Sequence, residues 1–131
     1  MSFEFINPES LGAPHGYANG VLAEPGRLLF IAGQIAWDQQ QQIVANDLVG
    51  QFDQALANVV AVVNEAGGKP EQIARLVIYV TDKNDYKSQM KEIGERYRAR
   101  MGKHFPAMVL VEVAGLLEDR AKIEIEGIAV L

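Results

Sequence analysis

The stretch KIEIE, from Lys122 to Glu126, alternates strictly between charged and apolar side chains. An alternation of period two is typical of a β-strand, and it sends Glu124 and Glu126 to one face of a sheet and two isoleucines to the other. A small domain rarely buries a carboxylate face. Glu124 is therefore a candidate site residue, and the alternative is a solvated carboxylate that pairs with Lys122 or Arg120 along the strand.

The stretch HFPAMVLVEV at 104–113 predicts a second strand that is apolar on both faces. A strand of this kind is usually buried on both sides. We expect it to lie inside a larger assembly, beside the strand that carries Glu124. A carboxylate near an apolar surface between subunits suggests a site.

The first half of the chain predicts a hairpin and a helix. The apolar-rich runs 17–23 and 27–33 are joined by Glu24-Pro25-Gly26. Because proline presets one dihedral angle and glycine allows positive φ, this is a tight-turn signal that favours a hairpin. From Asp47, which can cap a helix, apolar residues recur at helical spacing until Gly67-Gly68 ends the run.

The second half predicts a strand near 76–80, an amphipathic helix from Tyr86 to Met101 that ends near Gly102, and strands near 107–113 and 121–130. The predicted element order is therefore ββαβαββ, an α+β fold with two helices on one face of the sheet. Two helices leave the second face of such a sheet uncovered, although its strands are apolar. We expect a closed homo-oligomer to cover that face, and the alternative is a monomeric barrel.

Composition limits the class of protein. A chain of 131 residues with 49% hydrophobic and 22% charged residues suggests one domain over 1–131. A net charge of −5 argues against nucleic acid or an anionic membrane as a partner. The chain has no cysteine, no run of transmembrane length and no secretory signal pattern, so a cytoplasmic location is the default.

Six segments together carry a resemblance to a known family: GYANGV at 16–21, LLFIAGQIA at 28–36, QALANVVAVVNEAGG at 54–68, LVIYVTDKNDY at 76–86, FPAMVLVEV at 105–113 and KIEIEGIAV at 122–130. With these segments the chain resembles the Rid (reactive intermediate deaminase, YjgF-like) family over nearly its whole length. The resemblance implies a chorismate-mutase-like α+β fold with a mixed β-sheet, a homotrimer, and small-molecule clefts between subunits that hydrolyse 2-imino or 2-enamino acids.

The same resemblance assigns roles to particular residues. Glu124 matches the glutamate that positions or activates the attacking water, and Tyr17 matches a tyrosine that lines the cleft. Gly33 matches a glycine whose N–H contacts the substrate carboxylate. Trp37 lines the cleft or closes the contact between subunits, and sequence leaves both interpretations open.

Three positions depart from the family pattern. Met108 stands where the family has its substrate-binding arginine, Ala32 replaces a serine, and Met90 stands where many members have asparagine. An arginine fork makes two charge-assisted hydrogen bonds of about 1.5–3 kcal/mol each, and a thioether makes neither. Arg75 and Arg120 are the candidates to restore the cation, although each also fits a solvated charge at a strand end.

Other chemistries lack a motif. His15 and His104 have no metal-ligand spacing, and no phosphate loop or nucleophile elbow is present, so we expect neither metal nor cofactor. Two hypotheses remain. One is a hydrolase of an imine or enamine that lacks the usual amino-acid carboxylate, with Glu124 handling water. The other is a noncatalytic trimer that binds a small molecule or a protein.

Overall fold

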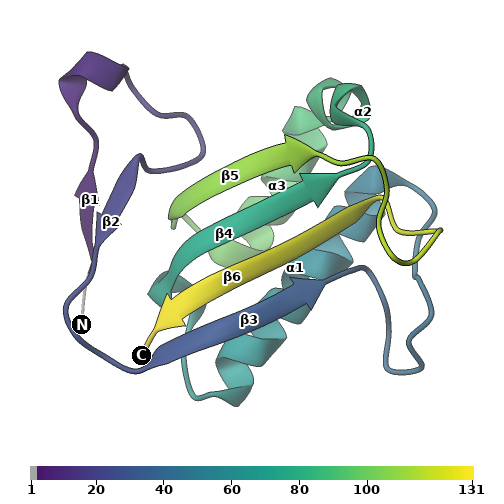
Figure 1. Ribbon diagram of the computed structural model, residues 1–131, viewed down its shortest axis with the longest axis horizontal. Helices are drawn as coiled ribbons and strands as arrows, with labels where there is room; N and C mark the ends of the chain where they lie inside the picture. The colour runs from purple at the N-terminus through teal and green to yellow at the C-terminus, as the bar shows by residue number, and fades with distance from the viewer. Residues whose placement is uncertain (1–2) are drawn as a thin grey trace.

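The computed structural model describes residues 3–131, and its centre is a four-stranded mixed sheet in the order β3-β6-β4-β5 (Figure 1). Strand β6, Ile123–Val130, pairs antiparallel with β3, Leu28–Gln34, and with β4, Ile73–Val80. Strand β5, Ala107–Glu112, pairs parallel with β4. The sheet is mixed, as expected, and the predicted α+β class is confirmed.

Helix α1, Leu48–Glu65, forms where the apolar spacing predicts it. The side chain of Asp47 accepts a hydrogen bond from the backbone N–H of Gly50 at 3.2 Å, which satisfies one of the free donors at the helix start. Gly67 follows the last turn with φ of 88°, a left-handed conformation that favours glycine and stops the helix. Both predicted ends of this helix are confirmed.

The predicted second helix is two helices, α2 at Lys83–Ser88 and α3 at Met90–Met101. Gln89 lies between them with φ −124° and ψ 22°, outside the helical region. The side chain of Asp82 accepts hydrogen bonds from two backbone N–H groups of α2, so α2 has a start of its own. The single-helix prediction was wrong because the apolar spacing continues across the break.

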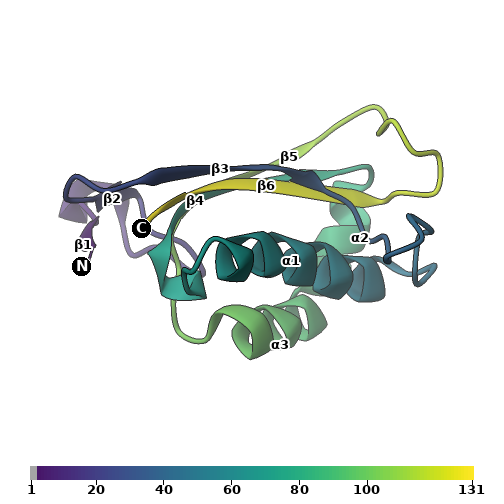
Figure 2. The ribbon, with the colours of Figure 1, turned by 90° about the horizontal axis from the view of Figure 1, so that it is seen from below.

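Both long helices lie on the same side of the sheet (Figure 2). Helix α1 contributes Phe52, Leu56 and Val59 to the core, and β6 contributes Ile123 and Ile125, all at 1% exposure or less. Helix α3 adds further side chains to the same core. The opposite face of the sheet is covered by no helix of the described residues, as the sequence predicts.

The N-terminal segment forms a separate two-stranded sheet, in which β1, Glu4–Ile6, pairs antiparallel with β2, Gly20–Leu22 (Figure 1). The predicted hairpin between 17–23 and 27–33 was therefore wrong, and strand β1 was not predicted. The side chain of Asn7 accepts a hydrogen bond from the backbone of Asn19, and the Ala18 N–H donates to Pro106. These contacts hold the part of the chain around Ala18 and Asn19 beside β1 and the start of β5, away from β3.

Strand β5 is an edge strand, and β4 separates it from β6. The prediction that it lies beside the strand carrying Glu124 was wrong within one chain. Strands β4 and β5 are joined through α2 and α3, and such a crossover places them side by side in parallel. The sheet stays open between its edges β3 and β5, so the barrel alternative is also wrong. Two short 3-10 helices, Glu9–Leu11 and Pro70–Gln72, complete the described elements.

Candidate functional site

Glu124 lies on the uncovered face of the sheet, half-buried and next to β3. Its carboxylate leans over Gly33: a β-carbon at that glycine would lie 2.8 Å from the carboxyl carbon of Glu124 and closer still to Oε2. The pairing of β3 with β6 shifts register between Ile31 and Gln34, which brings the glycine under the glutamate. Glu124 and Gly33, which the family resemblance assigns to the same cleft, are thus in contact. Any side chain larger than that of glycine at position 33 would collide with this carboxylate.

The neighbouring Glu126 has a partner, whereas Glu124 has none within residues 3–131. The Tyr79 hydroxyl donates to Oε1 of Glu126 at 2.5 Å, and this hydrogen bond raises the pKa of Tyr79. No ion pair joins Glu124 to Lys122 or Arg120 in that range, and Arg120 instead donates to Oδ1 of Asn46 at 3.0 Å. The Glu124 carboxylate is available to a water molecule or a ligand.

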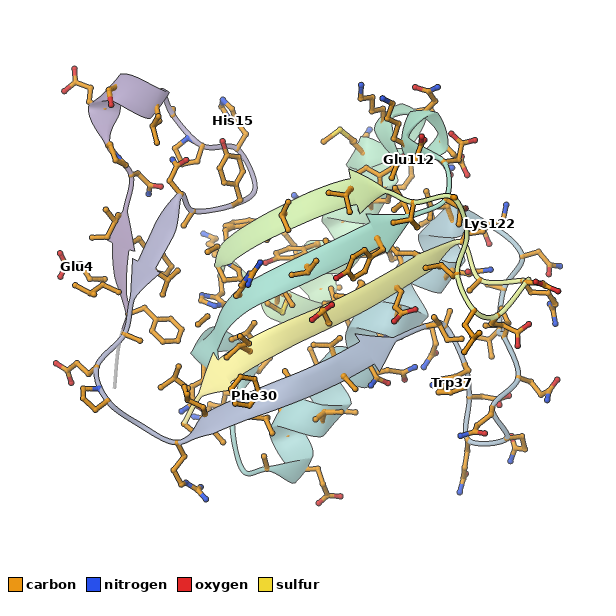
Figure 3. The ribbon with its side chains drawn as sticks, in the orientation of Figure 1. Glu4, His15, Phe30, Trp37, Glu112 and Lys122 are labelled. Atoms are coloured by element: carbon orange, nitrogen blue, oxygen red, sulfur yellow. The ribbon has the colours of Figure 1, made fainter. Side chains whose placement is uncertain are left out.

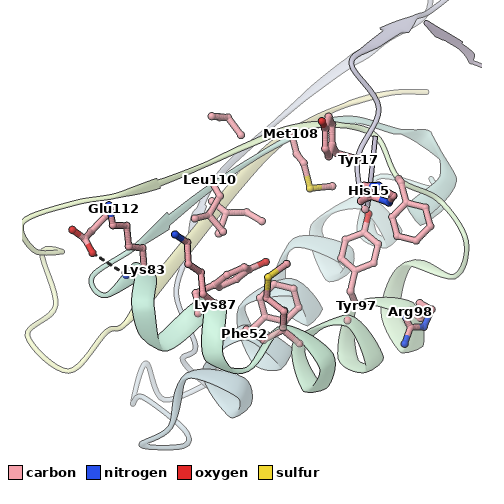
Figure 4. Close-up of a pocket in the computed structure, with 18 residues that line it drawn as sticks. His15, Tyr17, Phe52, Lys83, Lys87, Tyr97, Arg98, Met108, Leu110 and Glu112 are labelled. Atoms are coloured by element: carbon pink, nitrogen blue, oxygen red, sulfur yellow. Dashed lines mark hydrogen bonds between the residues drawn. The ribbon is translucent and has the colours of Figure 1, made fainter. Parts of the chain in front are cut away.

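A groove of about 750 Å³ lies under β5, between that strand and helices α2 and α3 (Figure 4). It brings together three of the residues singled out from the sequence, Tyr17, Met90 and Met108. Glu112, which shares a face of β5 with Met108, lines the same groove. A concave, mostly apolar space of this size is typical of a small-molecule site.

The groove also contains charged and aromatic residues that sequence reasoning did not assign to a site. The basic ones are Lys83, Lys87, Arg98 and His15. Arg75, a predicted candidate for the missing cation, is exposed on β4, and neither Arg75 nor Arg120 lines the groove. The i, i+4 spacing of Lys83 and Lys87 is a signal that they share a helix face, but nothing in the sequence shows that this face meets β5.

Two tyrosines under the groove keep their protons. Burial raises the pKa of Tyr86 and of Tyr97, and the Tyr97 hydroxyl donates to the carbonyl of His104 at 2.6 Å. The His104 ring is also bonded, with Nε2 at 2.6 Å from the carbonyl oxygen of Ile73. His104 is buried in a loop and is part of the core. No group of three or more metal-ligating side chains occurs within residues 3–131.

The remaining predicted residues lie elsewhere. Ala32 is exposed on β3, beside Gly33. Trp37 lines a separate hollow of about 470 Å³ with Gln34 and Asn58, and Figure 3 shows it beyond the end of β3. The Asn58 amide donates to the carbonyl oxygens of Ile35 and Trp37, each at 3.0 Å, which fixes this loop on α1.

The seven predicted site residues therefore fall into three places in one chain. The decisive separation is between Glu124 and Met108. Alternate residues of β5 point to opposite faces, and Met108 belongs to the face that meets the helices, whereas Glu124 belongs to the uncovered face. One chain alone does not bring these two side chains together.

Comparison with known proteins identifies the family. The family model described as Endoribonuclease L-PSP matches residues 8–131. A 2-iminobutanoate/2-iminopropanoate deaminase of Salmonella typhimurium is 39% identical over 117 residues, which cover 87% of this chain and 86% of that protein. A RutC family protein of Pyrococcus horikoshii is 38% identical over 128 residues, 96% of each chain. The chain belongs to the Rid family.

Solved structures of Rid proteins agree with this fold. A protein of unknown function from Yersinia pestis, YyfB of the Rid family, superposes with a TM-score of 0.89 over 100% of both chains at 33% identity. Escherichia coli TdcF, solved with bound serine, gives a TM-score of 0.69 at 34% identity, over 92% of this chain and 91% of TdcF. Within residues 3–131 of this Rid protein, none of the helices has the length and apolarity required to span a membrane.

Proposed function

We propose that this Rid protein hydrolyses an imine or enamine of a reactive small metabolite, with Glu124 positioning the attacking water. The observation that carries the proposal is the Glu124 carboxylate, half-buried above Gly33 and without a hydrogen-bond or ion-pair partner within residues 3–131. Relatives named as 2-iminobutanoate/2-iminopropanoate deaminases, at 38–39% identity, support the same chemistry. A cytoplasmic location remains a prediction.

The proposed site lies between two copies of the chain in a homotrimer. The uncovered face of the sheet is apolar at several positions: Phe30 is 71% exposed, Val109 is 42% exposed and Val111 is 39% exposed. In Figure 3 Phe30 lies on this face. Covering such side chains contributes about 25 cal/mol per Å² of apolar surface. A second copy that packs on this face places its own groove, the one lined by Met108, opposite Glu124 of the first copy. One chain alone does not bring the two together.

The reaction needs little from the protein. Water adds to the carbon of the C=N bond while the nitrogen gains a proton, and the C–N bond of the resulting amino alcohol then breaks to give a carbonyl compound and ammonia. Glu124 accepts a proton from the attacking water and returns it to the departing nitrogen. Tyr17, at the groove, and the Gly33 backbone N–H orient the ligand.

The substrate is anchored without an arginine at position 108. Met108 offers an adaptable apolar wall, and Met90 offers another on the same groove. A 2-imino acid that placed its carboxylate against Met108 would lose two charge-assisted bonds, at a cost on the order of a hundredfold in affinity. The preferred substrate therefore presents an apolar portion at this position.

Glu124→Gln tests the proposal. The protein is incubated with imines generated from several amino acids and from simple amines, and ammonia release is followed. We expect Glu124→Gln to lower kcat at least a hundredfold on the best substrate, the usual scale for a general base. Glu126→Gln is the matched control, since it alters the same residue type on the same strand and keeps an acceptor for Tyr79. Equal rates of native protein and Glu124→Gln across the panel would reject catalysis by Glu124.

A noncatalytic binding protein is the second candidate, and Met108 favours it, because the family's anchoring arginine is absent. On this hypothesis the groove senses or sequesters a ligand. The same assay separates the two candidates, since a binding protein releases no ammonia above the uncatalysed rate from any imine of the panel.

A further inference from the structure

The groove under β5 has an unequal distribution of charge. Its body is formed by aromatic and thioether side chains, among them Phe52, Phe105, Met90 and Met108. Three permanent cations line it, Lys83, Lys87 and Arg98, against one carboxylate, that of Glu112. An apolar body with a net positive lining complements a ligand that has an apolar body and an anionic group.

Lys87 is the cation that is best placed to receive the anion. In Figure 4 its ammonium group extends from α2 toward Leu110 on β5, whereas Arg98 points away from the groove. The guanidinium of Arg98 packs along its own helix, with Nη1 at 3.3 Å from the β-carbon position of Gly94. Within residues 3–131, Lys87 has neither an ion pair nor a side-chain hydrogen bond.

Within residues 3–131, the Glu112 carboxylate forms no ion pair with this lysine. Oε2 of Glu112 accepts a hydrogen bond from the backbone N–H of Lys83 at 2.9 Å, at the start of α2. This bond ties the end of β5 to the helix that carries Lys87, and so fixes the lysine relative to the groove. Tyr86 lines the groove beside it, and burial raises the pKa of its hydroxyl, so it stays a neutral donor.

We propose that the groove binds an organic anion with an aromatic or branched apolar body, and that Lys87 holds its carboxylate in place of a cation at position 108. Lys87 reaches toward Leu110, two residues along β5 from Met108, so the anionic group lies apart from the reacting carbon, with the apolar body between them. This proposal rests on the proposed function in one respect: the bound anion is the substrate only if the protein hydrolyses it. Binding itself requires no turnover.

The methionines report occupancy directly. Met90 and Met108 line the groove, whereas Met101 is 1% exposed in the core and serves as an internal control. With ¹³C-methyl-methionine protein, titration with 3-phenylpropanoate is expected to shift the Met90 and Met108 signals and leave Met101 in place. Propanoate, which lacks the apolar body, and 3-phenylpropanamide, which lacks the charge, are expected to bind at least about tenfold more weakly.

Lys87→Gln tests the role of the lysine, and Lys91→Gln is the matched control, because Lys91 is exposed on α3 and outside the groove lining. We expect Lys87→Gln to weaken 3-phenylpropanoate binding about tenfold and to leave the amide unaffected, while Lys91→Gln binds as the native protein. Unchanged affinity in Lys87→Gln, or equal affinity of native protein for acid and amide, overturns the proposal.

Two further outcomes are informative. Met90 and Met108 signals that change with protein concentration but not with 3-phenylpropanoate would show that a second copy fills the groove, and would overturn the proposal. If the native protein binds 3-phenylpropanoate with the dependence on Lys87 described above but releases no ammonia from any imine of the panel, the proposed reaction is wrong and this inference still stands.

Discussion

The two faces of the four-stranded sheet carry the same kinds of strand but different neighbours. On one face, Ile123 and Ile125 of β6 are fully buried under the helices. On the other, Phe30 is 71% exposed, and Glu124 and Glu126 of the same β6 are half-buried. Chain-internal packing explains the first face completely. The second face has the composition of an interface and the carboxylate of a candidate site.

The two faces of the sheet contribute to different properties of the chain, its folding and its association. The covered face determines whether the chain folds, because burial of its side chains supplies the hydrophobic free energy. The uncovered face is the surface through which we propose that the folded chain associates with further copies. Residues of the two faces alternate along each strand, so adjacent positions on β6 are expected to respond to substitution in different ways.

Two isoleucines of β6 give the largest test of this comparison. We expect Ile125→Ala, on the covered face, to lower the free energy of unfolding by about 2–5 kcal/mol at every protein concentration, because it leaves a cavity under the helices. We expect Ile128→Ala, opposite Phe30 on the uncovered face, to lower it mainly at concentrations where the protein is oligomeric. Urea unfolding at two protein concentrations, with sedimentation at each, measures both effects.

Equal losses for the two variants at low concentration would contradict the comparison, since Ile128 would then be buried by its own chain. A monomer at micromolar concentration in the native protein would remove the proposed site between subunits.

Sequence patterns predicted the covered face well. The alternation of KIEIE and the spacing from Asp47 depend on local geometry, a strand period of two and a helix period near 3.6, and both elements formed as expected. The family resemblance assigned Glu124 and Gly33 to the same cleft, but no pattern predicted their contact within one chain, since the two residues are far apart in the sequence.

The predictions that were wrong concern which strands pair and where a helix breaks. Glu24-Pro25-Gly26 carries a turn signal, yet β2 pairs with β1. The side chain of Asn7 and the carbonyl of Pro106 accept hydrogen bonds from backbone N–H groups next to β2, and the local pattern contains neither acceptor. The break at Gln89, which separates the helix of Lys87 from the helix of Met90, is not revealed by apolar spacing. Long-range partners of this kind are not encoded in a local period.

Gly33→Ala sharpens the assignment of the uncovered face. Its β-carbon would collide with the Glu124 carboxylate, which is the flexible end of a side chain, so the carboxylate moves and the fold is expected to lose less than about 1 kcal/mol. Displacement of the water-positioning group by about 1 Å is expected to lower kcat at least tenfold. Ammonia release and urea unfolding on the same samples separate the two effects.

Gly20→Ala is the matched control on another strand, because its β-carbon would meet Ile6 at 3.5 Å, an ordinary contact. Native activity in Gly33→Ala would show that the position of Glu124 above this glycine is irrelevant to the reaction.

The smallest expected effect concerns the covered side and asks whether charge as well as apolar packing holds the helices together. Asp53 of α1 accepts hydrogen bonds from Arg100 at 3.0 and 3.1 Å and from Arg96 at 3.1 Å, both on α3. The hydrogen bonds from Arg100, followed by the charges of both arginines, lower the pKa of Asp53 although burial opposes them. The arginine side chains are 40% and 48% exposed, so solvent screening limits the contribution of the pair to stability.

Because the pKa of Asp53 is lower in the folded chain than in the unfolded chain, the stabilisation is fully present above about pH 4–5, near and above the ordinary aspartate pKa, and is lost as the pH falls through the folded value. Asp53→Asn is expected to cost about 0.5–1 kcal/mol at pH 7, and its difference from the native protein is expected to shrink steadily below pH 4. Glu95→Gln, at an exposed position of α3 that has no ion pair among the described residues 3–131, controls for the loss of one negative charge. A cost for Asp53→Asn that stays constant down to pH 2 would mean that the ion pair contributes nothing, and that apolar packing alone joins α1 to α3.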